Sequence, residues 1–238
     1  MNLDPATLGA LIAAFVRGSA LAATAPVIGD SATPIRARLV FVIAVAFGVG
    51  LNRPGVPLGE LPMTVVLELA SGLITGATAR FTLAKVAVAG QLMGLSLGLG
   101  FAAAYDPHAE ESAGTLRTML TTLAALVFLG SGGLEAIVRS VAASPTSITD
   151  IALLGPQLVR AATSAFGHGL ALAGPIVLAA LVTNIGLAVM NRAAPAVNVF
   201  SISLSAVLIL GGIVMVATSG SLFGGVSDVA RRAVAVFG

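Results

Sequence analysis

The sequence predicts an all-α, polytopic integral membrane protein with six to seven hydrophobic helical segments and a short amphipathic helix at the C-terminus. Its 238 residues are 57% hydrophobic and only 9% charged, with a mean hydropathy of +1.04, whereas a typical globular domain has about 25% charged residues. From Ala161 to Ser227 the single obligate charge is Arg192. A bilayer accepts such a stretch, because a spanning helix needs roughly 20 mostly apolar residues. The apolar runs are continuous and do not alternate with polar residues, which favours helices over a membrane β-barrel.

Seven apolar segments follow one another along the chain. They are expected near residues 6–28, 39–52, 62–79, 82–104, 118–142, 167–190 and 197–219. The third and fourth are separated only by residues 80–85, without glycine or proline, so they form either a hairpin or one long helix. Pro175 lies inside the sixth segment and should kink it. Prolines punctuate the connections, as expected where helices end: Pro34, Pro54, Pro57, Pro107, Pro145 and Pro156.

The whole chain, residues 1–238, is expected to form one membrane domain. At its end, residues 221–238 place apolar side chains near one helical face and Asp228, Arg231 and Arg232 elsewhere. This pattern predicts an interfacial helix lying on the membrane, with a frayed terminal helix as the alternative.

The positive charges predict an N-terminus outside the cell and a C-terminus in the cytoplasm. If successive segments alternate in direction, three basic residues lie outside: Arg53, Arg117 and Arg192. The cytoplasmic side then receives most of the others: Arg36, Arg38, Arg80, Lys85, Arg139, Arg160, Arg231 and Arg232.

No enzyme site, metal or cofactor is expected from this sequence. Its two histidines, His108 and His168, lack paired carboxylates, and the chain has no cysteine, which argues against a zinc site. It contains no P-loop, nucleophile elbow or dinucleotide-binding fingerprint. The basic residues are scattered singly with few aromatic residues, which argues against nucleic-acid binding.

Glycines recur every fourth residue in two places, Gly72 and Gly76 and then Gly90, Gly94 and Gly98. This spacing puts them on one helix face, where a neighbouring helix can approach closely. The neighbour is either another helix of this chain or a helix of another subunit, and the sequence leaves both open.

Three charges interrupt apolar segments: Arg17, Glu68 and Glu135. A charge at the centre of a membrane helix costs roughly 2.5–3.5 kcal/mol on insertion scales. Pairing or extension toward the membrane rim is the favoured explanation. An ion pathway is second, because the three charges are isolated in the sequence.

A set of short motifs runs through nearly the whole chain in a fixed order. The motifs are Arg17, Thr24–Pro26, Thr33–Arg38, Gly90–Gly94, Gly98, Phe101, Tyr105–Pro107, Phe128–Leu129, Gly132–Gly133, Gly169–Ile176 and Asn191–Phe200. Taken together they resemble the FliR family of flagellar type III export gate proteins, which is homologous to the SctT family of injectisomes.

The resemblance implies a gate subunit without enzymatic activity, at the flagellar basal body in the bacterial inner membrane. It implies FliP-type and FliQ-type gate subunits and an FlhB-type export switch protein as partners, membrane lipid around the chain, and unfolded proteins as the exported substrates. Nucleic acid is not among the implied partners.

The resemblance also implies roles for particular residues. Four residues match the family's plug region, Phe101, Tyr105, Asp106 and Pro107, where apolar side chains would exclude water and ions from a narrow pore. The two glycine series would pack partner helices. The turn between the last two segments would be formed by a further set: Asn191, Arg192, Pro195, Asn198 and Phe200.

The chain departs from the family pattern at a few positions. Ala196 replaces a glutamine, Leu134 replaces a histidine, and Ser203 and Ser205 replace a Gly-x-Pro element. Three other functions stay open on sequence grounds: an injectisome gate subunit, a small secondary transporter, and a membrane scaffold. A transporter would usually show an internal repeat, and none is evident.

Overall fold

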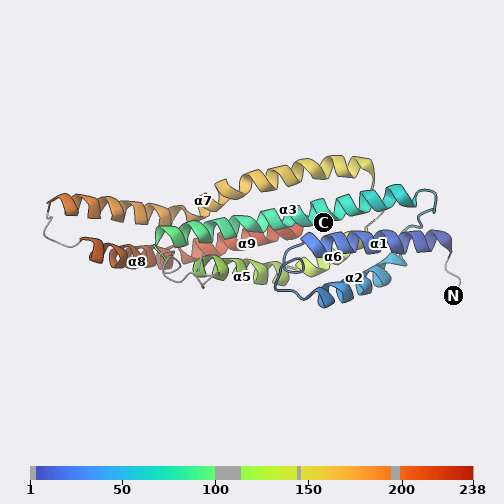
Figure 1. Ribbon diagram of the computed structural model, residues 1–238, viewed down its shortest axis with the longest axis horizontal. Coiled ribbons are helices and arrows are strands. Elements are labelled where there is room, and N and C mark those ends of the chain that lie inside the picture. The colour runs from blue at the N-terminus through green and yellow to red at the C-terminus, as the bar shows by residue number, and fades with distance from the viewer. Residues whose placement is uncertain (1–3, 100–113, 144–145, 194–198, 238) are drawn as a thin grey trace. The chain divides into compact units, whose positions relative to one another are not determined.

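The structure, a computed structural model, describes residues 4–99, 114–143, 146–193 and 199–237, which are helical apart from short connections (Figure 1). No strand occurs in these ranges, so the all-α prediction is confirmed. The helices are α1 (Pro5–Thr24), α2 (Ile35–Gly50), α3 (Leu61–Ser96), α5 (Thr115–Gly130), α6 (Gly133–Ala142), α7 (Ile148–Ala193), α8 (Val199–Ala217) and α9 (Ser219–Ala235).

Membrane-spanning length and hydropathy are found in three of these helices, α1, α3 and α7. Two bent pairs raise the number of candidate spans in the described ranges to as many as five: α5 with α6, at 57°, and α8 with α9, at 66°. A polytopic helical membrane protein is therefore the right class.

The third and fourth predicted segments form one helix, α3, which Figure 1 shows as a continuous ribbon. Its 36 residues extend about 54 Å at 1.5 Å per residue, well beyond a hydrocarbon core of about 30 Å. The helix ends in a left-handed glycine, Gly98, with φ of 73°. The amide of Leu99 donates to the carbonyl of Gly94 at 3.0 Å and that of Gly98 to Leu95 at 3.1 Å, a C-terminal cap that only glycine adopts without strain.

Because residues 80–85 are helical, no turn separates the third segment from the fourth. The predicted orientation assumed that the chain reverses direction in a cytoplasmic loop containing Arg80 and Lys85. The structure has no reversal there, so the sides of the membrane predicted for later residues lose their basis. The orientation of the chain stays a prediction.

Two predicted boundaries are wrong. Pro156 was expected in a connection, but α7 runs through both Pro156 and Pro175 for 46 residues. Each proline removes one backbone hydrogen bond, and each follows a glycine, Gly155 and Gly174, yet the helix continues through both. The fifth segment is instead broken at Gly132, whose φ of 84° starts a new helix, α6.

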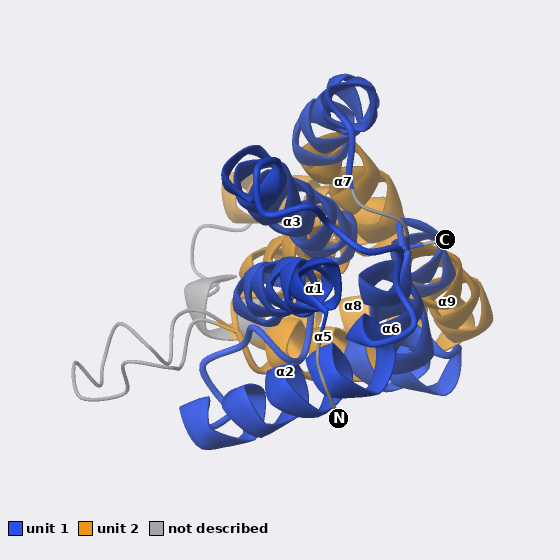
Figure 2. Ribbon diagram, turned by 90° about the vertical axis from the view of Figure 1, so that its right-hand side faces the viewer, with its two compact units in different colours: residues 1–83, 125–163, 230–238 blue, residues 84–124, 164–229 orange. Residues whose placement is uncertain are grey.

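The described chain divides into two compact units, coloured separately in Figure 2. Unit 1 comprises Met1–Leu83, Ala125–Thr163 and Ala230–Gly238, and unit 2 comprises Ala84–Ala124 and Ser164–Val229. Four helices, α3, α5, α7 and α9, contribute residues to both.

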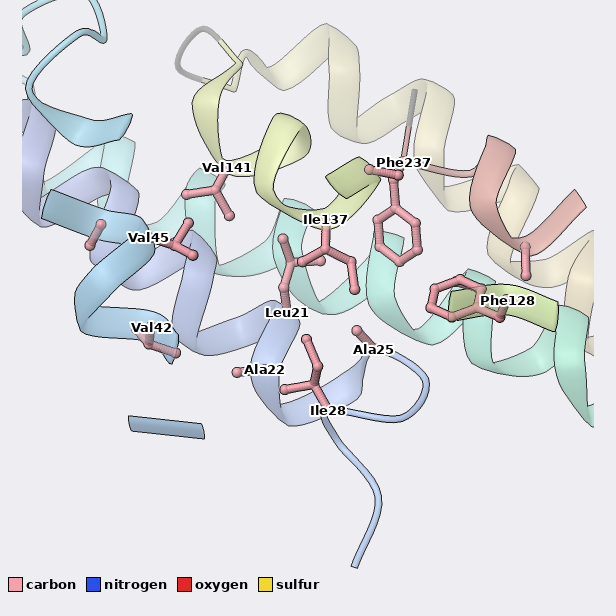
Figure 3. Close-up of a cluster of buried hydrophobic side chains, with 14 of the residues drawn as sticks. Leu21, Ala22, Ala25, Ile28, Val42, Val45, Phe128, Ile137, Val141 and Phe237 are labelled. Carbon is pink, nitrogen blue, oxygen red and sulfur yellow. The ribbon is translucent and has the colours of Figure 1, made fainter. Parts of the chain in front are cut away.

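The core of unit 1 joins α1, α2 and α6 to the ends of α5 and α9 (Figure 3). Leu21, Phe128 and Ile137 are fully buried in it. Phe237 meets Phe128 edge to face, with ring centroids 6.3 Å apart, a geometry that aromatic quadrupoles favour.

The last residues of the C-terminal helix, α9, therefore pack against other parts of the same chain. Ala230 and Ala233 are fully buried in the core of unit 1, and Phe237 is nearly so. This burial is not consistent with a frayed terminal helix, which was the alternative left open by the sequence. Contact between the rest of α9 and a membrane surface stays a prediction.

Unit 2 is held by small residues between helices. A Cβ added to Gly169 would lie 2.6 Å from a side-chain atom of Val88, and one added to Gly225 would lie 2.6 Å from Leu172. Real Cβ atoms do not come this close, so both glycines are required for the observed helix spacing.

Candidate functional site

A buried cluster of charges lies inside unit 1 and joins segments that are distant in the sequence. Glu68 of α3 is fully buried and lies between two arginines, Arg17 of α1 and Arg53 of the α2–α3 connection. Their side chains are only 6% and 1% exposed. We call these three residues the ion cluster.

Both oxygens of the Glu68 carboxylate lie within ion-pair distance of an arginine, and Oε1 also accepts hydrogen bonds. Arg17 Nε lies 2.5 Å from Oε2, and Arg17 Nη2 donates to Oε1 at 3.1 Å. Arg53 Nη2 donates to Oε1 at 2.9 Å. The backbone amide of Thr146 donates to the same oxygen at 3.0 Å, so one carboxylate fixes three other segments of the chain.

Arg17 extends the cluster to α6. Its Nη1 donates to the carbonyl of Ser140 at 2.9 Å, and its Nη2 donates to the hydroxyl of Thr146. The residues that connect α6 to α7 are therefore tied to α1 and α3 at one point.

The ion cluster carries a net charge of +1 and leaves two donors of Arg53, Nε and Nη1, buried without a hydrogen-bond partner in the described chain. Desolvation makes buried ion pairs weak stabilisers, but removing one partner costs about 3–5 kcal/mol, because a buried charge is left uncompensated. This arrangement fixes the geometry of the segments more than it adds net stability.

Pairing, the favoured explanation for the interrupting charges, holds for Arg17 and Glu68, which are not isolated in the fold. Glu135 is also paired, but at the surface: it lies in the first turn of α6, 2.7 Å from Arg139, with both side chains at least 70% exposed. Arg53, expected on the outer side of the membrane, is the member that sequence reasoning missed.

The first glycine series lies on the same face of α3 as Glu68. A Cβ at Gly72 would lie 2.6 Å from the Cβ of Ala20 and 2.8 Å from the carbonyl oxygen of Arg17. A Cβ at Gly76 would lie 2.1 Å from the hydroxyl of Thr24. Glu68, Gly72 and Gly76 therefore form one stripe against α1.

The second glycine series does not act as one surface. A Cβ at Gly90 would lie 2.6 Å from the Cα of Arg117, within unit 2, whereas one at Gly94, which is buried, would meet no atom of the described residues within 4 Å. Gly98 follows α3 and forms its C-terminal cap. Contact of any of these glycines with other subunits stays a prediction.

The other predicted site residues are mostly outside the described residues. This holds for all four plug candidates, Phe101, Tyr105, Asp106 and Pro107, and for Pro195 and Asn198. Asn191 and Arg192 are exposed in the last turn of α7, and Phe200 belongs to the first turn of α8.

Apolar side chains cover the outside of the long helices. Only 17% of the most apolar 18-residue window of α7 is buried. Leu178, Val182 and Val189 on α7 are more than 60% exposed, as are Ile209 and Val216 on α8. Exposed apolar area of this size marks contact with lipid or with other proteins.

A metal site is not found in the described ranges. They contain no group of three or more histidine, cysteine, aspartate or glutamate residues that could hold a metal ion. The ion cluster consists of two guanidinium groups and one carboxylate, all buried. Its interactions hold distant segments of the chain together.

The sequence matches the family of bacterial export proteins, family 1, over residues 8–233. The chain belongs to this family. Among its relatives, the flagellar biosynthetic protein FliR of Escherichia coli K12 is 29% identical over 210 residues, covering 82% of this chain and 78% of that protein. FliR of Caulobacter vibrioides is 30% identical and covers 83% of each.

A further relative is the surface presentation of antigens protein SpaR of Salmonella typhimurium. It is 28% identical over 178 residues, covering 71% of this chain and 66% of that protein. These relatives confirm the resemblance to the FliR family. SpaR is a relative whose name does not refer to flagella.

Replacing Glu68 with Gln is expected to lower the stability of the chain by about 3–5 kcal/mol, because Arg17 and Arg53 would share a buried site without a counter-charge. Thermal unfolding of the detergent-extracted protein measures this effect. Glu135→Gln is the matched control, since it breaks an exposed ion pair that contributes little. Equal melting temperatures for the two variants would contradict a structural role of the ion cluster.

Gly72→Ala is expected to cost about 1–3 kcal/mol, because the added methyl group meets Ala20 and the backbone of Arg17. Gly186→Ala on α7 is the matched control and should not lower the melting temperature, since Gly186 is exposed and no atom of the described residues lies within 4 Å of the added group. An equal loss of stability in the two variants would contradict the close contact of Gly72 with α1.

Proposed function

We propose that this chain is a subunit of the flagellar protein export gate and forms part of the wall of a protein-conducting channel in the inner membrane. The match to bacterial export proteins over residues 8–233 carries the proposal, and relatives named flagellar biosynthetic protein support the flagellar system. The chain would do no covalent chemistry, and energy for export would come from other components.

The exposed apolar faces of α7 and α8 support assembly with other subunits. On α7, Leu181, Ile185 and Val189 are all more than half exposed, and on α8 the same holds for Ile209 and Ile213. FliP-type and FliQ-type helices and, at the periphery, lipid would cover these faces, with an FlhB-type protein as a further partner.

The segment from Phe101 to Pro107 would close the pore before secretion. Apolar side chains at a narrow constriction exclude water and therefore ions, while an unfolded chain moving through the pore can displace them. Tyr105, Asp106 and Pro107 would shape the turn of this plug. The turn containing Asn191, Arg192, Pro195, Asn198 and Phe200 would connect the last two segments.

A gate for an injectisome is the second candidate, and the similarity to SpaR over 178 residues is the observation that favours it. The same fold and the same faces would serve in both systems.

Deleting the gene in its own bacterium is expected to abolish swimming and the appearance of flagellar proteins in the culture medium, and re-expression should restore both. Swimming halos in soft agar and immunoblots of the medium measure the effect. If swimming persists while another secreted set of proteins is lost, the injectisome assignment replaces the flagellar one. Normal swimming and secretion together would rule out both.

Phe101→Ala, expressed with the partner subunits, is expected to increase ion leak across the inner membrane, because a smaller side chain would leave the constriction wetted. Conductance of the reconstituted complex in planar bilayers measures it. Phe223→Ala is the matched control, since Phe223 is 55% exposed on α9. A leak equal to that of the unchanged complex would argue against the plug role of Phe101.

A further inference from the structure

Arg53 is the member of the ion cluster whose hydrogen bonds are least satisfied. Its Nη2 donates to Oε1 of Glu68 at 2.9 Å. Its Nε and Nη1 are buried and have no hydrogen-bond partner among the described residues, and the side chain is only 1% exposed. Buried polar groups in proteins are nearly always paired, because an unpaired one keeps its full desolvation cost. The two nitrogens therefore require an acceptor that the described residues do not supply.

Arg17 has a different environment within the same cluster. It donates to the carbonyl of Ser140 at 2.9 Å, to the hydroxyl of Thr146 and to the Glu68 carboxylate. Glu68 has little capacity left for Arg53, because its Oε1 already accepts from both arginines and from the amide of Thr146. Its Oε2 lies 2.5 Å from Nε of Arg17. The unpaired donors and the excess charge are thus both at Arg53.

The charges of the ion cluster do not balance. Two guanidinium groups share one carboxylate, which leaves a net charge of +1. Asp150 follows Thr146 closely in the sequence, but its carboxylate is exposed and accepts from the amide and the hydroxyl of Ser147, each at 2.8 Å. A buried ion without a counter-charge is strongly disfavoured. Water or a carbonyl group can accept a hydrogen bond from Arg53, but neither supplies a negative charge.

The connection that carries Arg53 is fixed on α1. The amide of Val56 donates to the carbonyl of Ala6 at 2.9 Å, and a Cβ added to Gly9 would lie 2.2 Å from the carbonyl oxygen of Val56. The amide of Arg53 itself donates to the carbonyl of Gly50 at 3.3 Å. The backbone is therefore held on both sides of Arg53, which keeps the guanidinium in its buried position.

We propose that the ion cluster binds one small monovalent anion, such as chloride, within hydrogen-bond distance of Nε or Nη1 of Arg53. A single negative charge brings the net charge of the cluster to zero and also accepts a hydrogen bond from the guanidinium. A divalent anion such as sulfate would exceed the charge of the cluster, and its oxygens would need more donors than these two nitrogens provide. The anion would hold the α2–α3 connection in place, and the inference does not depend on the export function.

Chloride is expected to stabilise the protein, because a ligand that binds only the folded state shifts the unfolding equilibrium by mass action. The full chain, purified in detergent with its co-expressed partners, would be dialysed into sodium gluconate, whose anion is too large for a buried site. Chloride would then replace gluconate at constant ionic strength. The Tm should rise by about 3–5 °C for each tenfold increase in chloride above its Kd. Bromide should act as chloride does.

Arg53→Gln tests whether this guanidinium binds the anion, since the variant leaves a balanced pair of Arg17 and Glu68. Its Tm should not depend on chloride. In gluconate it should melt close to the unchanged protein, whose excess charge is then uncompensated. Arg192→Gln is the matched control, because Arg192 is exposed in the last turn of α7. Its Tm should rise with chloride as that of the unchanged protein does.

A measurement on the unchanged protein covers the case in which Arg53→Gln does not fold. Crystals of the complex grown in bromide should give an anomalous difference peak at hydrogen-bond distance from Nε or Nη1 of Arg53.

Three results would overturn the proposal. One is an equal Tm in chloride and gluconate, which would show that a neutral acceptor satisfies Arg53. Another is an undiminished effect of chloride in Arg53→Gln, which would show general stabilisation by salt. The third is the absence of a bromide peak at the Arg53 guanidinium.

Discussion

The packing of unit 1 depends on the single carboxylate of Glu68, which is fully buried between two arginines. An ionised group without water around it is tolerated only if its partners are in place. Here the partners come from α1, the α2–α3 connection and the residues after α6, so none of these segments can shift without exposing the others to a large desolvation cost. The interaction therefore fixes the register of the helices more than it strengthens them.

Close helix contact and charge pairing are parts of one arrangement in unit 1. Glu68, Gly72 and Gly76 follow one another at intervals of four on α3, and their counterparts on α1 are Arg17, Ala20 and Thr24. The missing side chains at the glycines bring the two backbones together, and this brings the guanidinium of Arg17 within 2.5 Å of the carboxylate. A larger residue at position 72 would separate the charged groups as well as the helices.

Local sequence chemistry predicted the helical membrane class, and the resemblance of its ordered motifs indicated the export family, but neither predicted every helix boundary. Hydropathy cannot distinguish two helices from one when charged residues such as Arg80 and Lys85 leave the helix unbroken, and proline alone did not end α7 at Pro156. The four-residue spacing from Glu68 to Gly72 and Gly76 is a sequence signal that Glu68 faces a packed helix, but it does not identify Arg17 as the partner. Arg53 had none, because it lies in a connection whose path only tertiary packing determines.

The length of α3 has a consequence for how the chain lies in a bilayer. A helix of 36 residues exceeds the thickness of the hydrocarbon core, and α7, with 46 residues and most of its apolar window uncovered, exceeds it further. Such a helix has to tilt, bend or leave the hydrocarbon at one end. Apolar surface that leaves the hydrocarbon is shielded from water only by other protein.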